Sequence, residues 1–120
     1  MKRLICVEKS PAACDDFIIN LNEFENVELY QAQAEDVLPK KDLRPDILLT
    51  DPPAVGLARH TIDGILHQTP SVIAYLSRDP ATLARDAKRL RKGGYTLESV
   101  TPFDMAPHQA EIYSLALFKR

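Results

Sequence analysis

The stretch Asp46-Ile47-Leu48-Leu49-Thr50-Asp51-Pro52-Pro53 decides how the rest of this chain is organised. An apolar run that ends in an acid and two prolines is typical of a β-strand buried on both faces. Proline cannot donate to a strand ladder and fixes its own φ angle, so we expect Asp51 to be held at the strand's carboxyl end. Ligands bind at that end of the strands in open α/β sheets. The same residues also fit an ordinary strand followed by a proline turn.

The composition indicates one globular domain over residues 1–120. The chain has 45% hydrophobic and 27% charged residues, which weighs against extended disorder. Its net charge of −2 excludes a general attraction to nucleic acid, so any such contact must be local. No run of the sequence approaches the roughly 20 apolar residues of a membrane span, and we expect a cytoplasmic protein.

Apolar runs and helical patterns alternate along the chain. Ser10-Pro11 and Asp79-Pro80 each give a helix N-cap with proline at the first helical position. The alternation predicts an α/β fold with a mostly parallel sheet, and two closing strands joined by a loop predict that the last strand is antiparallel. Strands are expected at residues 3–7, 27–30, 46–50, 71–76, 95–100 and 112–118, with residues 4–7, 47–50 and 72–76 buried.

Acidic side chains follow successive strands. Glu8, Asp36 and Asp51 lie at or just beyond strand ends, which predicts that they gather at one edge of the sheet together with Ser77. Such carboxylates suit a ribose, an amine or a cation, although each acid alone also fits a helix cap or a solvated loop. The chain contains neither a GxGxxG motif nor a P-loop, so direct phosphate binding is disfavoured.

Basic residues are concentrated at residues 88–92, in the last turns of the helix that begins at Pro80. They complement the negative end of that helix, and a local contact with a nucleic-acid backbone is the alternative. The histidines have no metal-binding spacing, and Cys6 and Cys14 fit buried apolar positions better than a disulfide. We therefore predict no metal site.

The order of several short motifs is more specific than any one of them. Taken together, they closely resemble the catalytic half of the S-adenosylmethionine-dependent RNA (uracil-5-)-methyltransferases, over roughly residues 3–119. The motifs are Asp51-Pro52-Pro53-x-x-Gly56-Leu57, Tyr75-Leu76-Ser77-x-x-Pro80-Ala81-Thr82-Leu83-Ala84-Arg85-Asp86, Gly94-Tyr95, Val100-Thr101-Pro102-Phe103-Asp104-Met105-Ala106-Pro107 and Glu111.

This resemblance implies a Rossmann-like class I methyltransferase sheet, S-adenosylmethionine as the cofactor, and rRNA or tRNA as the partner. By position, Glu8 would bind the ribose hydroxyls of the cofactor, and Gln33 would contact its adenine, where the family more often has Asp or Asn. Asp51 would lie between the cofactor and the target base. Glu111 matches the family's base, which removes the C5 proton of uracil.

Arg78 is the first departure from the family pattern, because it occupies the position of the nucleophilic cysteine. The family's reaction requires a thiolate to add to C6 of uracil so that C5 becomes nucleophilic. A permanently charged guanidinium offers no lone pair for this step. Cys6 and Cys14 belong to other elements and should not substitute, so we expect the chain to be inactive by itself.

The second departure is the absence from this sequence of the family's glycine-rich first strand and turn. Without that strand, a hole is expected between the strands of Leu4 and Leu48, unless the two re-pair or a second chain or a dimer fills it. The sequence therefore predicts one truncated methyltransferase-like domain over residues 1–120, with weak or absent binding of S-adenosylmethionine.

Two other functions fit parts of the sequence. A receiver-like signalling domain would use Asp51 as phosphoacceptor and Ser77 as switch hydroxyl. However, receivers carry an acidic pair after the first strand, where this chain has Glu8 alone, and the expected lysine after the fifth strand is not evident. The third possibility is a non-catalytic pseudoenzyme that binds RNA or a partner and keeps the methyltransferase fold.

Overall fold

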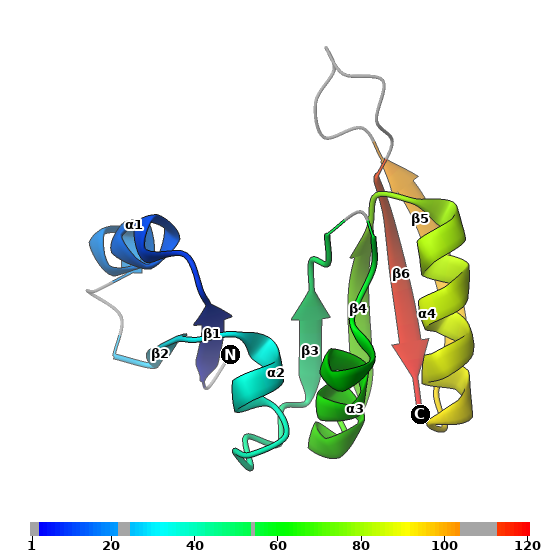
Figure 1. The fold of residues 1–120 in the computed structure, drawn as a ribbon, viewed down its shortest axis with the longest axis horizontal. Coiled ribbons are helices and arrows are strands. Elements are labelled where there is room, and N and C mark those ends of the chain that lie inside the picture. The colour runs from blue at the N-terminus through cyan, green and yellow to red at the C-terminus, as the bar shows by residue number, and fades with distance from the viewer. Residues whose placement is uncertain (1–2, 22–24, 54, 104–112) are drawn as a thin grey trace.

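Figure 1 shows a computed structural model of the chain, which describes residues 3–21, 25–53, 55–103 and 113–120. Strands and helices alternate as predicted, and the last two elements are strands. The elements are β1 (Leu4–Glu8), α1 (Pro11–Leu21), β2 (Val27–Gln31), α2 (Ala34–Val37), β3 (Ile47–Thr50), α3 (Arg59–Gln68), β4 (Val72–Ser77), α4 (Pro80–Lys92), β5 (Thr96–Phe103) and β6 (Tyr113–Lys119).

The strands form two sheets. β1 and β2 make a parallel pair, and the other four strands have the order β3-β4-β6-β5. β3 and β4 are parallel, whereas β6 lies antiparallel between β4 and β5. The predicted antiparallel last strand is confirmed. Its insertion is incompatible with the all-parallel sheet of a receiver domain, so the receiver interpretation is wrong.

The predicted hole between the first strand and the Leu48 strand is also present. β1 and β3 belong to different sheets and do not re-pair with each other in the described part of the chain. Figure 1 shows their arrowheads pointing the same way, with β1 between β2 and β3 in that view. The sheet is therefore interrupted at this point.

Burial of β3 on both faces was predicted wrongly. Leu48 packs against the core, but Ile47 is 65% exposed and Leu49 is 70% exposed. β1 is half-buried along its length, although a buried strand was expected. In β4, Ile73, Ala74, Tyr75 and Ser77 are buried, whereas the other two residues are half-buried. An apolar run specifies a strand, but the burial of each face depends on what covers it, and among the described elements the helices of the core pack on the Leu48 face of β3.

The hydrophobic core lies between one face of the four-stranded sheet and helices α3 and α4. The strands contribute Ile73 and Tyr75 from β4 and Phe118 from β6, and all three side chains are almost completely buried. The helices add buried apolar side chains of Ile62, Ile65, Leu83 and Leu90. No described helix is long and apolar enough to cross a membrane.

Helix α4 begins and ends as the sequence predicted. The Asp79 carboxylate accepts a hydrogen bond from the backbone N–H of Ala81 at 2.8 Å, and Pro80 occupies the first turn. The helix stops before Gly94, whose φ of +99° is accessible to glycine at little cost. Its last turn carries Arg89, Arg91 and Lys92, where positive charge complements the helix dipole.

A buried amide, which no sequence pattern indicated, holds the loop before β3. The Gln68 Nε2 group donates to the carbonyls of Leu38 and Lys41, and its Oε1 accepts from the backbone N–H groups of Leu43 and Arg44. Gln68 itself is 1% exposed at the end of α3. One side chain thus satisfies four backbone groups of the loop, which would otherwise lack partners.

Replacing Gln68 with leucine should strongly destabilise the protein. Gln68→Leu keeps the side-chain size but leaves those backbone groups unpaired, so we expect the free energy of unfolding to fall by about 3 kcal/mol. Urea denaturation measures this change. His67→Leu is the matched control, because His67 is an exposed neighbour in the same helix, and it should change the free energy by less than about 0.5 kcal/mol. Equal effects of the two variants would contradict the assigned role.

Candidate functional site

The candidate site lies at the carboxyl ends of β3 and β4. Asp51 directly follows β3, and Ser77 is the last residue of β4. Because the two strands are parallel and adjacent in register, with Thr50 opposite Tyr75, these ends meet at one edge of the sheet. Glu8 ends β1, which points the same way as β3 in Figure 1. The predicted placement of Asp51 and Ser77 at one edge is confirmed.

Arg78 lies at this edge and contacts Asp51, which follows β3, and Tyr113, the first residue of β6. Its Nη2 atom lies 3.8 Å from Asp51 Oδ1, and its guanidinium carbon lies 5.5 Å from the centre of the Tyr113 ring. The Arg78 and Asp51 side chains are about half exposed, so their ion pair contributes at most about 1 kcal/mol. A permanent positive charge therefore lies beside the Asp51 carboxylate.

Ser77 has a structural role in the turn from β4 to α4. Its hydroxyl donates to the carbonyl of Asp79 at 3.1 Å and accepts from the Asp79 N–H at 3.3 Å. The residue is 3% exposed. These two bonds tie the end of β4 to the N-cap of α4 and thereby place Arg78, which lies between them in sequence.

The other predicted site residues lie in the first half of the chain or outside the described residues. Glu8 is half-buried, and its Oε1 accepts a hydrogen bond from the Ser10 N–H at 3.0 Å. Gln33 is exposed at the N-cap of α2 and makes no side-chain cap bond there, and Asp36 is exposed in the first turn of α2. Glu111 lies outside the described residues.

Metal binding finds no support in the part of the chain that the structure describes. No group of three or more His, Cys, Asp or Glu side chains in the described ranges is placed to hold a metal ion. Cys6 and Cys14 are both free thiols, and Cys14 is buried at the start of α1. The carboxyl ends of β3 and β4 carry the Asp51 carboxylate, the Ser77 hydroxyl and the Arg78 guanidinium.

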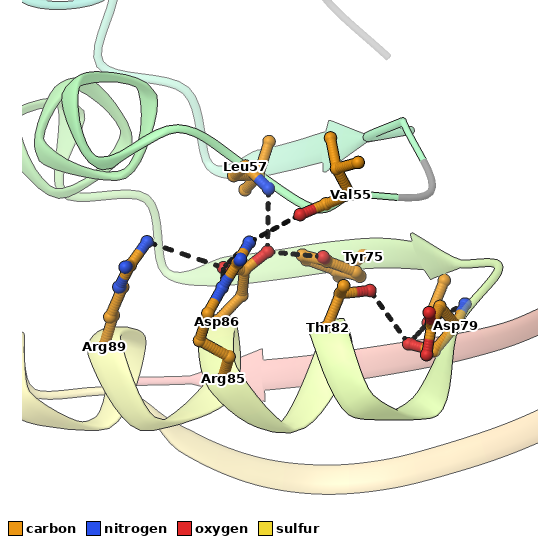
Figure 2. Close-up of polar contacts among 9 residues, drawn as sticks. Val55, Leu57, Tyr75, Asp79, Thr82, Arg85, Asp86 and Arg89 are labelled. Carbon is orange, nitrogen blue, oxygen red and sulfur yellow. Dashed lines mark hydrogen bonds and ion pairs between the residues drawn. The ribbon is translucent and has the colours of Figure 1, made fainter.

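Asp86 is the most deeply buried charged residue near the site, and the motif that ends at this residue did not predict its role. Figure 2 shows its carboxylate at the centre of a polar network. Its Oδ2 accepts hydrogen bonds from the Leu57 N–H at 2.8 Å and from the Tyr75 hydroxyl at 2.6 Å. Its Oδ1 faces Arg85 at 3.3 Å and Arg89 at 3.9 Å. The sequence could have indicated the burial of Asp86, because this residue falls on the same helical face as the apolar residues Leu83 and Leu90.

This network holds the loop that follows Asp51 against α4. Arg85 Nη2 donates to the Val55 carbonyl at 2.7 Å, next to the bond from Leu57 to Asp86 (Figure 2). Gly56 passes between them with a φ of +86°, and a Cβ atom there would lie 2.3 Å from Arg85 Nη2 and 2.8 Å from Asp86 Oδ2. Only glycine fits, and the loop approaches α4 closely at this point.

The network also changes the acidity of Tyr75. Burial raises the pKa of the Tyr75 phenol above its ordinary value of 10.0, and the hydrogen bond to Asp86 raises it further. The hydroxyl therefore stays protonated and can act as a donor to the carboxylate. Tyr75 links β4 to α4 through this bond.

Comparison with known proteins identifies relatives along almost the whole chain. An uncharacterized RNA methyltransferase of Bacteroides thetaiotaomicron is 35% identical over 98% of this chain and 27% of its own length. One of Thermosynechococcus vestitus is 39% identical over 95% of this chain and 26% of its own length. The chain thus spans about a quarter of the length of these curated relatives. No family model matches the sequence.

A solved methyltransferase structure has the same fold over almost the whole of this chain. The tRNA (uracil-54, C5)-methyltransferase of Pyrococcus abyssi, in complex with S-adenosyl-L-homocysteine, matches 97% of this chain with a TM-score of 0.80 and 24% sequence identity. The match covers 28% of that protein's chain. The described elements therefore have the arrangement of a methyltransferase domain, which confirms the Rossmann-like fold implied by the motifs.

Removing the Asp86 carboxylate should loosen the loop after β3. Asp86→Ala leaves the Leu57 N–H and the Tyr75 hydroxyl without an acceptor, and we expect a loss of about 3 kcal/mol of unfolding free energy. Hydrogen exchange should show faster exchange at Gly56 and Leu57. Asp63→Ala, which removes an exposed carboxylate from α3, is the control and should change the unfolding free energy by less than about 0.5 kcal/mol. Unchanged exchange at Leu57 would contradict this role.

The Tyr75 phenol should make the protein less stable at alkaline pH. Above about pH 10 the unfolded chain releases this proton while the folded chain keeps it, so the free energy of unfolding falls as the pH rises. Tyr75→Phe has no proton to lose and should show a smaller fall, measured by urea denaturation between roughly pH 8 and 11. The prediction fails if Tyr75→Phe keeps the slope of the unmodified protein.

Proposed function

Because the chain belongs to the RNA methyltransferase family over the part that it covers, we propose that it is the carboxyl-terminal part of the catalytic domain of an RNA (uracil-5-)-methyltransferase. In this proposal residues 1–120 form one truncated methyltransferase-like domain, the methyl donor is S-adenosylmethionine, and the RNA is rRNA or tRNA. A role in RNA processing and a cytoplasmic location follow from the same assignment.

The sheet edge at Asp51 is the observation that carries this proposal. The Asp51-Pro52-Pro53 motif and the Tyr75-Leu76-Ser77 motif are 24 positions apart between Asp51 and Tyr75, yet parallel pairing of β3 and β4 brings their ends together. The Asp51 carboxylate and the side chain at position 78 lie 3.8 Å apart. In the family that the motifs resemble, these positions hold the acid beside the target base and the nucleophile.

The residues present suit the adenosine part of the cofactor. A ribose needs a carboxylate acceptor, and Glu8 has a second oxygen besides the one that accepts from Ser10. Gln33 is exposed, makes no cap bond, and could donate to and accept from an adenine ring. S-adenosylmethionine would supply the methyl group from its sulfonium. The described residues include no glycine-rich turn for its methionine part, so we expect binding no tighter than about millimolar.

Arg78 argues against turnover by the chain as it stands. The guanidinium pairs with Asp51 and covers Tyr113, and it has no lone pair to add to C6 of uracil. Cys6 lies in β1, a strand of the two-stranded sheet, and Cys14 lies in helix α1, which follows that strand, so neither can replace it. Glu111 is the proposed base for the C5 proton. A non-catalytic protein that binds RNA or a partner is therefore the second candidate, and Arg78 is the observation that favours it.

A further part of this proposal concerns the interrupted sheet. A second chain or a second copy of this chain would complete the sheet between β1 and β3, because unpaired strand edges in the middle of a fold are unfavourable. The site would then be assembled from two polypeptides.

Transfer of a labelled methyl group from S-adenosylmethionine to a uracil-containing RNA tests the proposal. The unmodified chain should show no transfer, either alone or mixed with the remainder of the Thermosynechococcus vestitus relative, that is, that protein without the matching residues. Arg78→Cys should transfer only in the mixture, because nucleophile, base and methyl donor must be assembled together.

Arg78→Ala is the matched control, since it removes the same charge without adding a thiol, and it should remain inactive in the mixture. Transfer by the unmodified chain alone would overturn the assignment of Arg78. Inactivity of Arg78→Cys in a mixture that does bind the RNA would favour the non-catalytic candidate.

A further inference from the structure

The exposed side of helix α4 carries positive charge only. The helix has one acid, Asp86, and that carboxylate is completely buried. Its five cations are Arg85, Lys88, Arg89, Arg91 and Lys92. The whole chain has a net charge of −2, and helix α1, on the other side of the molecule in Figure 1, has two exposed acids and no cation. Charge is therefore distributed unevenly, and α4 presents a basic surface.

The cations of α4 fall into two groups. Arg85 and Arg89 are turned toward Asp86, as Figure 2 shows, and lie 3.3 Å and 3.9 Å from its Oδ1 atom. Lys88, Arg91 and Lys92 are exposed and form no hydrogen bond or ion pair with any described residue. Three positive charges thus remain without a counter-charge among the described residues.

Helix stability alone does not explain these three charges. Positive charge complements the negative end of a helix only within the last turn, and Lys88 precedes that turn. Arg91 and Lys92 follow Lys88 by three and four positions, and like charges at these spacings destabilise a helix. A bound anion would remove this repulsion.

Two open grooves place cations on both sides of α4. The groove between α4 and α3 is lined by three cations and one acid, namely Arg59, Arg89, Lys92 and Asp63. The groove between α4 and β5 is lined by the other two exposed cations, Lys88 and Arg91. We call these five cations from α3 and α4 the α4 surface.

A row of cations in open grooves suits an extended polyanion. Lysine and arginine side chains that neutralise successive phosphates release counterions, which supplies affinity without reading the base sequence. The residues that line the two grooves include no aromatic side chain on which a base could stack. The exposed residues of α4, all of which the structure describes, include no large apolar side chain that would enter a lipid bilayer. These features favour a nucleic-acid backbone as the ligand.

We propose that the α4 surface is a second contact site for RNA, which binds the sugar-phosphate backbone away from the target base. The inference rests on the proposed function for the choice of RNA as the polyanion. Helix α4 begins beside the carboxyl edge that holds Asp51 and runs to the opposite edge of the sheet, where β5 begins. Lys92 lies about 18 Å along the helix from Pro80. The contact therefore adds affinity and leaves the chemistry at Asp51 unchanged.

Fluorescence anisotropy with a fluorescein-labelled, uridine-containing RNA stem-loop at several salt concentrations tests the proposal. The unmodified chain should bind, and binding should weaken as the salt concentration rises. The surface variant combines three substitutions, Lys88→Gln, Arg91→Gln and Lys92→Gln. It should weaken binding by about tenfold or more at low salt and reduce the salt slope by about 2, because three phosphate contacts are lost. A second stem-loop of unrelated sequence should be weakened equally.

A matched control variant removes the same kinds of charge elsewhere. It combines Arg3→Gln, Lys9→Gln and Lys40→Gln, all at exposed positions before β3. This variant should keep the salt slope and leave the affinity within about twofold. Circular dichroism checks that both variants are folded.

Chemical acetylation of the unmodified chain gives a measurement that needs no substitution. Bound RNA should slow acetylation of Lys88 and Lys92 by about threefold or more, because phosphates cover their amines. Acetylation of Lys9 and Lys40 should be unchanged.

Four results would contradict the proposal: no RNA binding at low salt, equal weakening by the two variants, unchanged acetylation of Lys88 and Lys92, or tighter binding of polyglutamate or of phosphatidylserine vesicles than of RNA. The last result would assign the surface to an acidic protein or a membrane. None of these measurements requires methyl transfer. Transfer by Arg78→Cys in the mixture, together with full RNA affinity of the surface variant, would reject the α4 surface and leave the proposed function intact. RNA binding at the α4 surface without any such transfer would do the reverse.

Discussion

The buried carboxylate of Asp86 is the interaction on which the candidate site depends. It lies on the core face of α4 and accepts hydrogen bonds from the backbone of the loop after β3 and from the Tyr75 hydroxyl in β4. A charge without partners would be very unfavourable in this position, so the loop and the helix must stay together for the carboxylate to be satisfied. The path of the chain on leaving Asp51 is set by this requirement and by the close passage of Gly56.

The second constraint is that a strand inside a sheet pairs along both of its edges. In the four-stranded sheet β4 and β6 meet this requirement, since β6 is inserted between β4 and β5, and the core face is covered by two helices. On the other side, β3 and β1 are complete strands with one partner each. The structure therefore combines a well-packed unit with an interrupted edge, and the apolar residues of β3 are exposed at the interruption.

The turn from β4 to α4 does not depend on the side chain of Arg78, which lies within it. Ser77 and Asp79 build the turn from β4 to α4 through backbone and hydroxyl hydrogen bonds, and neither contact involves the side chain between them. Position 78 can therefore exchange a thiol for a guanidinium without disturbing the helix cap. Under the proposed function, such an exchange puts a fixed charge beside Asp51 and removes the lone pair that nucleophilic addition needs.

Local features of the chain could be predicted from the sequence, whereas burial and long-range hydrogen bonds were decided by the tertiary structure. The strands, the Asp79-Pro80 helix start and the end of β3 before Pro52 depend on residues within a few positions, so the pattern alone indicates them. The exposure of Leu49 and the roles of Gln68 and Asp86 depend on contacts with residues more than ten positions away. An apolar run specifies a strand, but only the neighbours that it meets in space determine whether it is covered.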